Sequence, residues 1–253
     1  MVYSKKLSKY DEIRHCFFNS IGGVSKGIYK SLNCGIGSKD KKSNIKKNLK
    51  IVKQKISKRS KEIFFVKQTH SNKYVYLSKK SKLINRSINA DAIITEKKNF
   101  PIAVLTADCV PILMFDKKRK MIAAVHAGWR GAYKNIAQKV IKFMFAKGCT
   151  KENLIVAIGP CISMKNYEVK KKFKNNFTNK KKENQFFFKN HKNKIFFNLG
   201  NYIKNQVKLN QIRNIDQLNI DTFNKKNNFF SARRSLKYNH NDYGRNISII
   251  VIN

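Results

Sequence analysis

The chain has 253 residues, of which 42% are hydrophobic and 11% aromatic, and this composition excludes a disordered tail and a fibrous repeat. Its 55 Lys and Arg residues against 14 Asp and Glu give a formal net charge of +41 at pH 7, so the surface should attract polyanions. The five cysteines include no C-x-x-C pair, which argues against a disulfide framework and against a zinc ribbon.

The positive charge has two interpretations. One is a basic RNA-binding protein, since a basic surface is the electrostatic footprint of nucleic-acid binders. The other is compositional bias, because Lys is accompanied by abundant Asn, Ile and Phe, which all have A/T-rich codons. The basic residues are also scattered in short runs, such as 170–172 and 180–182, rather than gathered in one arm. We favour compositional bias, and we expect non-specific nucleic-acid binding at low salt in either case.

The sequence shows no targeting or membrane-spanning segment. The first residues, from Met1 to Lys6, lack the apolar segment of a secretory signal. The longest apolar stretch, Pro101 to Phe115, contains Asp108 and two prolines, so it is not suited to span a bilayer. We therefore expect a cytoplasmic protein without a membrane partner.

The first hundred residues predict two glycine-bearing loops, then a helix, then short strands. The loops cover 22–27 and 33–38, and apolar residues recur at helical spacing from Ser43 onward. Strands are predicted over Glu62 to Val66, Tyr74 to Leu77 and Ala92 to Thr95.

The middle of the chain is its most hydrophobic part. Residues 101–106 and 110–115 are continuous apolar runs, typical of strands buried on both faces, and Ala107-Asp108-Cys109 joins them. A third buried strand is predicted over Met121 to Val125, interrupted at His126. A helix that begins near Gly131 and a strand over Leu154 to Ile158 should follow.

The last third is rich in Lys and Asn. A helix followed by a loop is predicted over Lys170 to Lys194, and strands over Asn214 to Ile220 and Asn246 to Ile252. Strands and helices mix without strict alternation. The pattern therefore predicts a layered α/β (α+β) fold with mixed β-sheets flanked by helices, as a single domain over 1–253, and the family resemblance described below makes it a layered sandwich.

Three side chains in the apolar regions could carry chemistry: His70, Cys109 and His126. Burying polar groups without partners costs free energy, so their presence there suggests a site. Two imidazoles and one thiolate could hold a tetrahedral zinc with an open fourth position. Alternatively, Cys109 is a nucleophile with His126 as its base, as in a thiol hydrolase, or the residues are ordinary buried side chains. Asp108 is a candidate acid or base, or part of a hydrogen-bonded turn.

Four segments of the sequence resemble the laccase-domain (polyphenol-oxidase-like) family, regarded as zinc-dependent purine nucleoside phosphorylases. They are Lys67-Gln-Thr-His70, Ala90-Asp-Ala-Ile-Ile-Thr95, Leu105-Thr-Ala-Asp-Cys-Val-Pro111 and Ala124-Val-His-Ala-Gly-Trp-Arg-Gly131. The resemblance implies a layered mixed-sheet sandwich, and it assigns His70, Cys109 and His126 as the metal-binding and catalytic set. It also implies Zn2+, with Cu2+ as an alternative at the same site, and phosphorolysis of adenosine, inosine or methylthioadenosine.

The family's oxidase name is not supported by the histidine count. The chain has five histidines and no H-x-H pair, whereas a multicopper oxidase needs paired H-x-H motifs, so laccase chemistry is excluded. An adenosine deaminase side activity would need a base other than that of the cytidine-type enzymes, because the H-x-E and P-C-x-x-C signature is absent.

Phosphate binding calls for arginines or for backbone N–H groups at a helix start. Arg130, which lies next to the helix expected near Gly131, fits both requirements by position. Arg234 and Arg245 are the further candidates for holding phosphate, and an ordinary surface role is the alternative for each of them.

Overall fold

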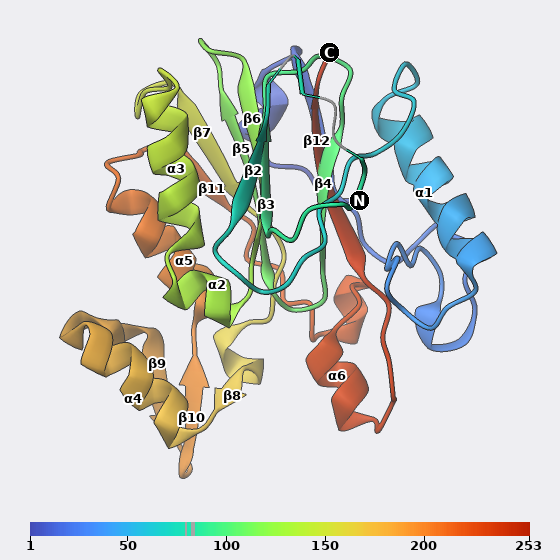
Figure 1. Cartoon of the computed structure of the whole chain (residues 1–253). Coiled ribbons are helices and arrows are strands. Elements are labelled where there is room, and N and C mark those ends of the chain that lie inside the picture. The colour runs from blue at the N-terminus through green and yellow to red at the C-terminus, as the bar shows by residue number, and fades with distance from the viewer. Residues whose placement is uncertain (79, 82–83) are drawn as a thin grey trace.

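The structure is a computed structural model that describes residues 1–78, 80–81 and 84–253. Its core is a sandwich of two sheets, with a smaller third sheet to one side (Figure 1). The six-stranded sheet has the order β11-β7-β5-β6-β3-β2, the second sheet β1-β12-β4, and the third β8-β10-β9. The fold class predicted from the sequence is confirmed.

The strands have the following bounds. The six-stranded sheet contains β2 (Tyr74–Leu77), β3 (Ala92–Thr95), β5 (Val110–Asp116), β6 (Met121–Ala127), β7 (Leu154–Ile158) and β11 (Ile215–Gln217). The second sheet contains β1 (Ile13–Phe17), β4 (Ile102–Thr106) and β12 (Asn246–Ile252), and the third β8 (Glu168–Val169), β9 (Phe188–His191) and β10 (Lys194–Phe197).

Helices cover both outer faces of the sandwich (Figure 1). The helices of the structure have the bounds α1 (Lys42–Ile56), α2 (Trp129–Tyr133), α3 (Ile136–Ala146), α4 (Lys171–Lys180), α5 (Leu199–Lys208) and α6 (Ala232–Lys237). Helices α3 and α5 pack against one face of the six-stranded sheet, and α1 covers the outer face of the second sheet. No helix within the described ranges is long and apolar enough to cross a membrane.

Strand β5 shows why its sequence is apolar throughout. Ile112 and Met114 pack toward α3 and α5, whereas Leu113 and Phe115 pack into the core between the two sheets. Alternate side chains of a strand point to opposite faces, and both faces of this strand are covered. The continuous run of apolar residues is therefore explained by two layers of packing.

The predicted strand over Glu62 to Val66 is wrong. Only isolated bridges form here, from Phe64 to Ile102 and from Lys67 to Asn89. The amide of Phe65 donates to the side chain of Asn85 at 2.8 Å instead of pairing with a strand. The segment is apolar because residues 63–66 are buried, and burial alone does not make a strand.

The C-terminal third needs two further corrections. Helix α4 confirms the helix predicted within Lys170 to Lys194, but the predicted loop is a 3-10 helix (Lys182–Phe187) followed by the β9-β10 hairpin. The rings of Phe188 and Phe197 stack across this hairpin at 4.7 Å, which gives it an apolar face. The strand predicted over Asn214 to Ile220 is reduced to the three residues of β11.

Gly159 lets the two main sheets approach each other closely. A Cβ added there would lie 2.2 Å from a ring carbon of the buried Phe17 on β1 and 2.9 Å from Pro111 Cγ. We expect Gly159→Ala to lower the free energy of unfolding by about 1–3 kcal/mol, because a well-packed core resists added volume. Urea unfolding measures this, and Gly37→Ala, where a Cβ meets nothing within 4 Å, is the matched control. Equal stability of the two variants would contradict the close approach.

Candidate metal centre

The three side chains predicted as metal ligands converge at one end of the six-stranded sheet. His70 precedes β2 in a left-handed backbone conformation, with φ of 57°, and Cys109 immediately precedes β5. His126 lies within β6, opposite Pro111 of β5, so the strand predicted to stop before this histidine in fact runs through it. The antiparallel pairing of β5 and β6 places the start of β5 beside the end of β6, so Cys109 and His126 lie at the same end of the sheet.

Their donor atoms are close enough to share one ion. One ligand atom from each of the three residues lies within 4.8 Å of the others, and Cys109 Sγ is 3.9 Å from His70 Nε2. Ligands around a tetrahedral zinc, at about 2.0–2.3 Å from the metal, lie roughly 3.3–3.8 Å apart. Small side-chain movements would bring the triad to these distances, so the donor set fits zinc.

Asp91 fixes the positions of both histidines. This fully buried carboxylate accepts a hydrogen bond from His126 Nδ1 at 2.8 Å and from the backbone N–H of His70 at 3.0 Å. The N–H and hydroxyl of Ser71 donate to it at 2.6 and 2.7 Å. Since Nδ1 of His126 is occupied, its Nε2 is left for a metal, as in carboxylate–histidine–zinc arrangements.

The charges of the site support an ionised cysteine. Burial opposes ionisation of the Cys109 thiol, but attraction to His126 and hydrogen bonds with both histidines outweigh it and lower its pKa to about 7. Burial also disfavours the charged form of His126, yet Cys109 and Asp91 raise its pKa to about 9. A thiolate is the form that binds metal, and it is also the form that acts as a nucleophile.

Gly128 leaves the space that the ligands occupy. A Cβ at this position would lie 2.8 Å from His70 Cδ2 and 2.9 Å from Cys109 Sγ. The backbone itself, with φ of −72°, would accept alanine. We therefore expect Gly128→Ala to fold but to bind zinc at least about tenfold more weakly, because the added methyl group displaces two ligands. A chelator competition assay measures the affinity against that of the wild-type protein; unchanged affinity of Gly128→Ala would contradict this packing.

The triad opens into a cavity of about 280 Å³. The cavity also has three cationic side chains, Lys67, Arg86 and Arg245, and one tyrosine, Tyr243. The Arg245 guanidinium lies 4.6 Å from the centre of the Tyr243 ring. The cavity therefore combines a potential metal site with positive charge suited to an anion such as phosphate.

The other predicted site residues point elsewhere. The buried Asp108 carboxylate accepts hydrogen bonds from the Thr222 and Ser231 hydroxyls and from the Arg233 N–H, at the start of α6. The Arg234 guanidinium donates to backbone carbonyls of residues 222, 223 and 229.

Arg130 lies at the protein surface. Its guanidinium is 5.3 Å from the Trp129 ring. The longer helix predicted to begin near Gly131 begins at Ile136, and Arg130 belongs to the five-residue α2. The structure therefore does not place Arg130 at the start of the longer helix.

Four residues of the site were missed in the sequence: Asp91, Lys67, Arg86 and Tyr243. Asp91 had a signal, because it is the charged residue directly before an apolar strand and lies in one of the four segments of the resemblance. Arg86 and Tyr243 line the cavity but belong to no motif, and they reach it from loops distant in the sequence. Only the folded arrangement brings them there.

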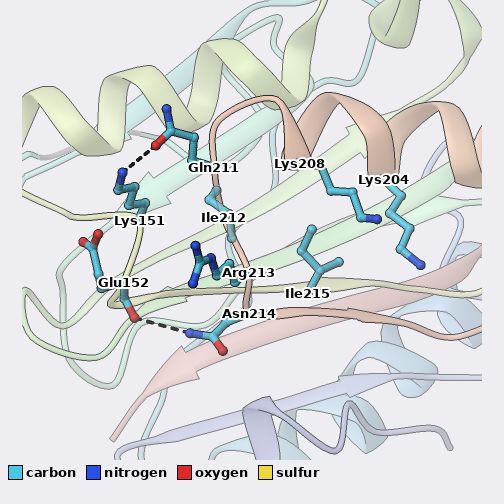
Figure 2. A pocket seen from close by; sticks show the side chains of 9 residues that line it. All are labelled: Lys151, Glu152, Lys204, Lys208, Gln211, Ile212, Arg213, Asn214 and Ile215. Atoms are coloured by element: carbon cyan, nitrogen blue, oxygen red, sulfur yellow. Dashed lines mark hydrogen bonds between the residues drawn. The ribbon is translucent and has the colours of Figure 1, made fainter.

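A larger cavity lies away from the triad, and its lining has a different chemistry. About 1220 Å³ in volume, it is bordered by Lys151, Lys204, Lys208 and Arg213, with Glu152 as the acidic member (Figure 2). Lys151 is hydrogen-bonded to Gln211, so one of these cations has a partner already. Among the described residues that line this cavity there is no cysteine or histidine, and the cavity offers only general electrostatic attraction for anions.

Comparisons with known proteins agree on one family. Residues 14–253 match the family described as "Multi-copper polyphenol oxidoreductase laccase". A Bacteroides thetaiotaomicron protein named "Purine nucleoside phosphorylase" is 34% identical over 70% of this chain and 68% of its own length. A Haemophilus influenzae protein of the same name is 32% identical over 90% of each chain. A solved Neisseria meningitidis structure superposes with a TM-score of 0.83 at 26% identity, covering 96% of both chains.

Proposed function

The chain belongs to the multi-copper polyphenol oxidoreductase laccase family, and from this premise we propose that it is a zinc-dependent purine nucleoside phosphorylase. The observation that carries the proposal is the convergence of His70, Cys109 and His126 in a cavity with cationic side chains. The names of the relatives support the same activity. The substrates would be a purine nucleoside, namely adenosine, inosine or methylthioadenosine, and inorganic phosphate.

In this reaction the bond between C1′ of the pentose and the purine nitrogen breaks, and a phosphate oxygen bonds to C1′. The products are the free purine and a pentose 1-phosphate. Arg86 and Arg245 hold the phosphate, because guanidinium groups bind its oxygens through paired hydrogen bonds. Lys67 adds a third positive charge to the same cavity.

His70, Cys109 and His126 would hold the zinc, or Cu2+ at the same site. When bound, the metal supplies a Lewis acid that polarises an oxygen of the reactants. Asp91 keeps both imidazoles in the orientation that this binding needs. Asp108, a catalytic candidate in the sequence, would act by holding its neighbour Cys109 in place. Its carboxylate accepts hydrogen bonds from Ser231 and Arg233 at the start of α6.

Of the three arginines that the sequence suggested as phosphate ligands, Arg245 lines the cavity. For Arg130 and Arg234 that role stays a prediction.

A thiol hydrolase that uses Cys109 and His126 is the second candidate, favoured by the lowered pKa of the Cys109 thiol. The two functions differ in the reactivity of Cys109. A coordinated thiolate should resist alkylation by iodoacetamide in saturating zinc, whereas a free nucleophile should be alkylated at the same rate with or without zinc. The proposed location is the cytoplasm, where cysteines remain reduced, in keeping with five free cysteines.

The direct test is purine release from adenosine with and without phosphate. We expect adenine and ribose 1-phosphate in equal amounts, only with phosphate present, and loss of turnover after chelation that zinc restores. Full turnover in a metal-free preparation would overturn the proposal. An adenosine deaminase side activity would be detected in the same assay as inosine formed without phosphate.

A further inference from the structure

A second cavity, of about 440 Å³, is lined by residues near the triad rather than by the triad itself. Its lining has three aromatic side chains, Trp129, Tyr167 and Phe173, and three charged residues, Glu168, Lys170 and Arg233. The cavity differs in chemistry from the first one, where arginine and lysine predominate over aromatic side chains. A flat ring with polar groups at its rim would be suited to these walls, because aromatic side chains can stack on its face.

Two short connections place this cavity next to the triad. Trp129 directly follows Gly128, where an added Cβ would lie 2.8 Å from His70 Cδ2 and 2.9 Å from Cys109 Sγ. Arg233 donates its backbone N–H to the carboxylate of Asp108, the residue before Cys109, at 2.7 Å. A ligand in the aromatic cavity would therefore lie beside the metal centre.

The aromatic rings are held in fixed relative positions. The rings of Trp129 and Phe173 are 5.3 Å apart at an interplanar angle of 60°, and those of Tyr167 and Phe173 are 6.3 Å apart at 63°. Phe173 is stacked on the buried Phe177 at 4.8 Å, so its position does not depend on a ligand. The Arg233 guanidinium lies 5.4 Å from the centre of the Tyr167 ring. Rigid, half-buried rings of this kind are the surfaces on which nucleobases stack.

We propose that the cavity formed by Trp129, Tyr167 and Phe173 is the subsite for the purine base, and that the cavity containing Arg86 and Arg245 takes the phosphate. This inference rests on the proposed function. The two reactants are thus assigned to two cavities: the purine base to the aromatic cavity and the phosphate to the cationic cavity. The metal centre would lie beside both. The reacting C1′ atom would lie between them, near His70, Cys109 and His126.

The test uses Trp129, which is the single tryptophan of the chain. Titration of the zinc-loaded protein with free adenine should quench its fluorescence in a saturable manner, whereas inorganic phosphate alone should not. Phe173→Leu and Tyr167→Leu should each weaken adenine binding about 5- to 150-fold, the range expected for the loss of one stacking partner. The two variants change different segments, and circular dichroism verifies that each is folded.

Phe186→Leu is the matched control, because Phe186 is 78% exposed and lines a different cavity. It should leave adenine binding unchanged, and so should Arg86→Ala, which should instead raise the KM for phosphate. Absence of quenching, or quenching unaffected in both Phe173→Leu and Tyr167→Leu, would overturn the base subsite. Saturable adenine binding with this variant pattern, but no phosphate-dependent turnover, would refute the phosphorylase function while leaving the purine subsite intact.

Discussion

Replacing Cys109 by alanine should remove the bound metal and the phosphate-dependent release of purine together. The variant loses the thiolate, one of three protein ligands, and two histidines alone bind zinc much more weakly. Metal content by elemental analysis and turnover of adenosine should both fall at least about 100-fold, in line with the importance of each ligand to such sites. His126→Ala should behave in the same way.

Cys149→Ala is the matched control for this experiment. Cys149 is buried beside Met121 Sδ, within the packing of α3 against the sheet, and it contacts no part of the triad. The control should keep both the metal and the turnover. If Cys109→Ala retained zinc but lost turnover, the thiol would be a nucleophile and not a ligand, in agreement with the hydrolase alternative.

Asp91→Asn should weaken zinc binding by about 10- to 100-fold, the range found when a partner of a metal-bound histidine is removed. The amide is nearly the same size but is uncharged, so it no longer stabilises the orientation of His126 through a charged hydrogen bond. In Asp91→Ala, the partly exposed N–H groups of His70 and Ser71 also lose their acceptor, which lowers the free energy of unfolding by about 1 kcal/mol for each hydrogen bond. Chelator competition and urea unfolding measure the two effects separately.

Asp216→Asn is the control that separates metal binding from general stability. Asp216 also accepts hydrogen bonds, from the Ser4 hydroxyl and the Lys6 N–H, but it lies on β11, away from the triad. We expect this variant to lose stability and to bind zinc as the wild type does. Equal zinc affinity of Asp91→Asn and the wild type would show that Asp91 does not position the histidines.

The apolar pattern of the sequence was enough to locate most of the core. The continuous runs of β4 and β5 were predicted as buried strands, and both are buried. Their separation into two different sheets was not predictable, because it depends on the turn at Asp108. This residue has a φ of 85°, and hydrogen bonds from residues far along the chain hold it. The residues around Asp108 in the sequence do not indicate which distant residues will form these hydrogen bonds.

The candidate metal-binding residues had a related signal, which left a metal site, a thiol nucleophile and ordinary buried side chains open until the family resemblance favoured the first. His70, Cys109 and His126 are polar residues that interrupt or end apolar segments, and such residues need buried partners. The cationic wall of the cavity had no comparable signal. Arg86 and Tyr243 lie among many other surface residues in a chain with 55 Lys and Arg, so only the folded structure distinguishes them.

X-ray absorption at the zinc edge of the purified, zinc-loaded protein tests the central claim most directly. If His70, Cys109 and His126 bind one ion, the spectrum should contain one sulfur scatterer at about 2.3 Å and two nitrogen scatterers at about 2.0–2.1 Å, with one zinc per chain. The sulfur contribution should be lost in Cys109→Ala. A spectrum of the wild-type protein with only nitrogen and oxygen neighbours would contradict the account.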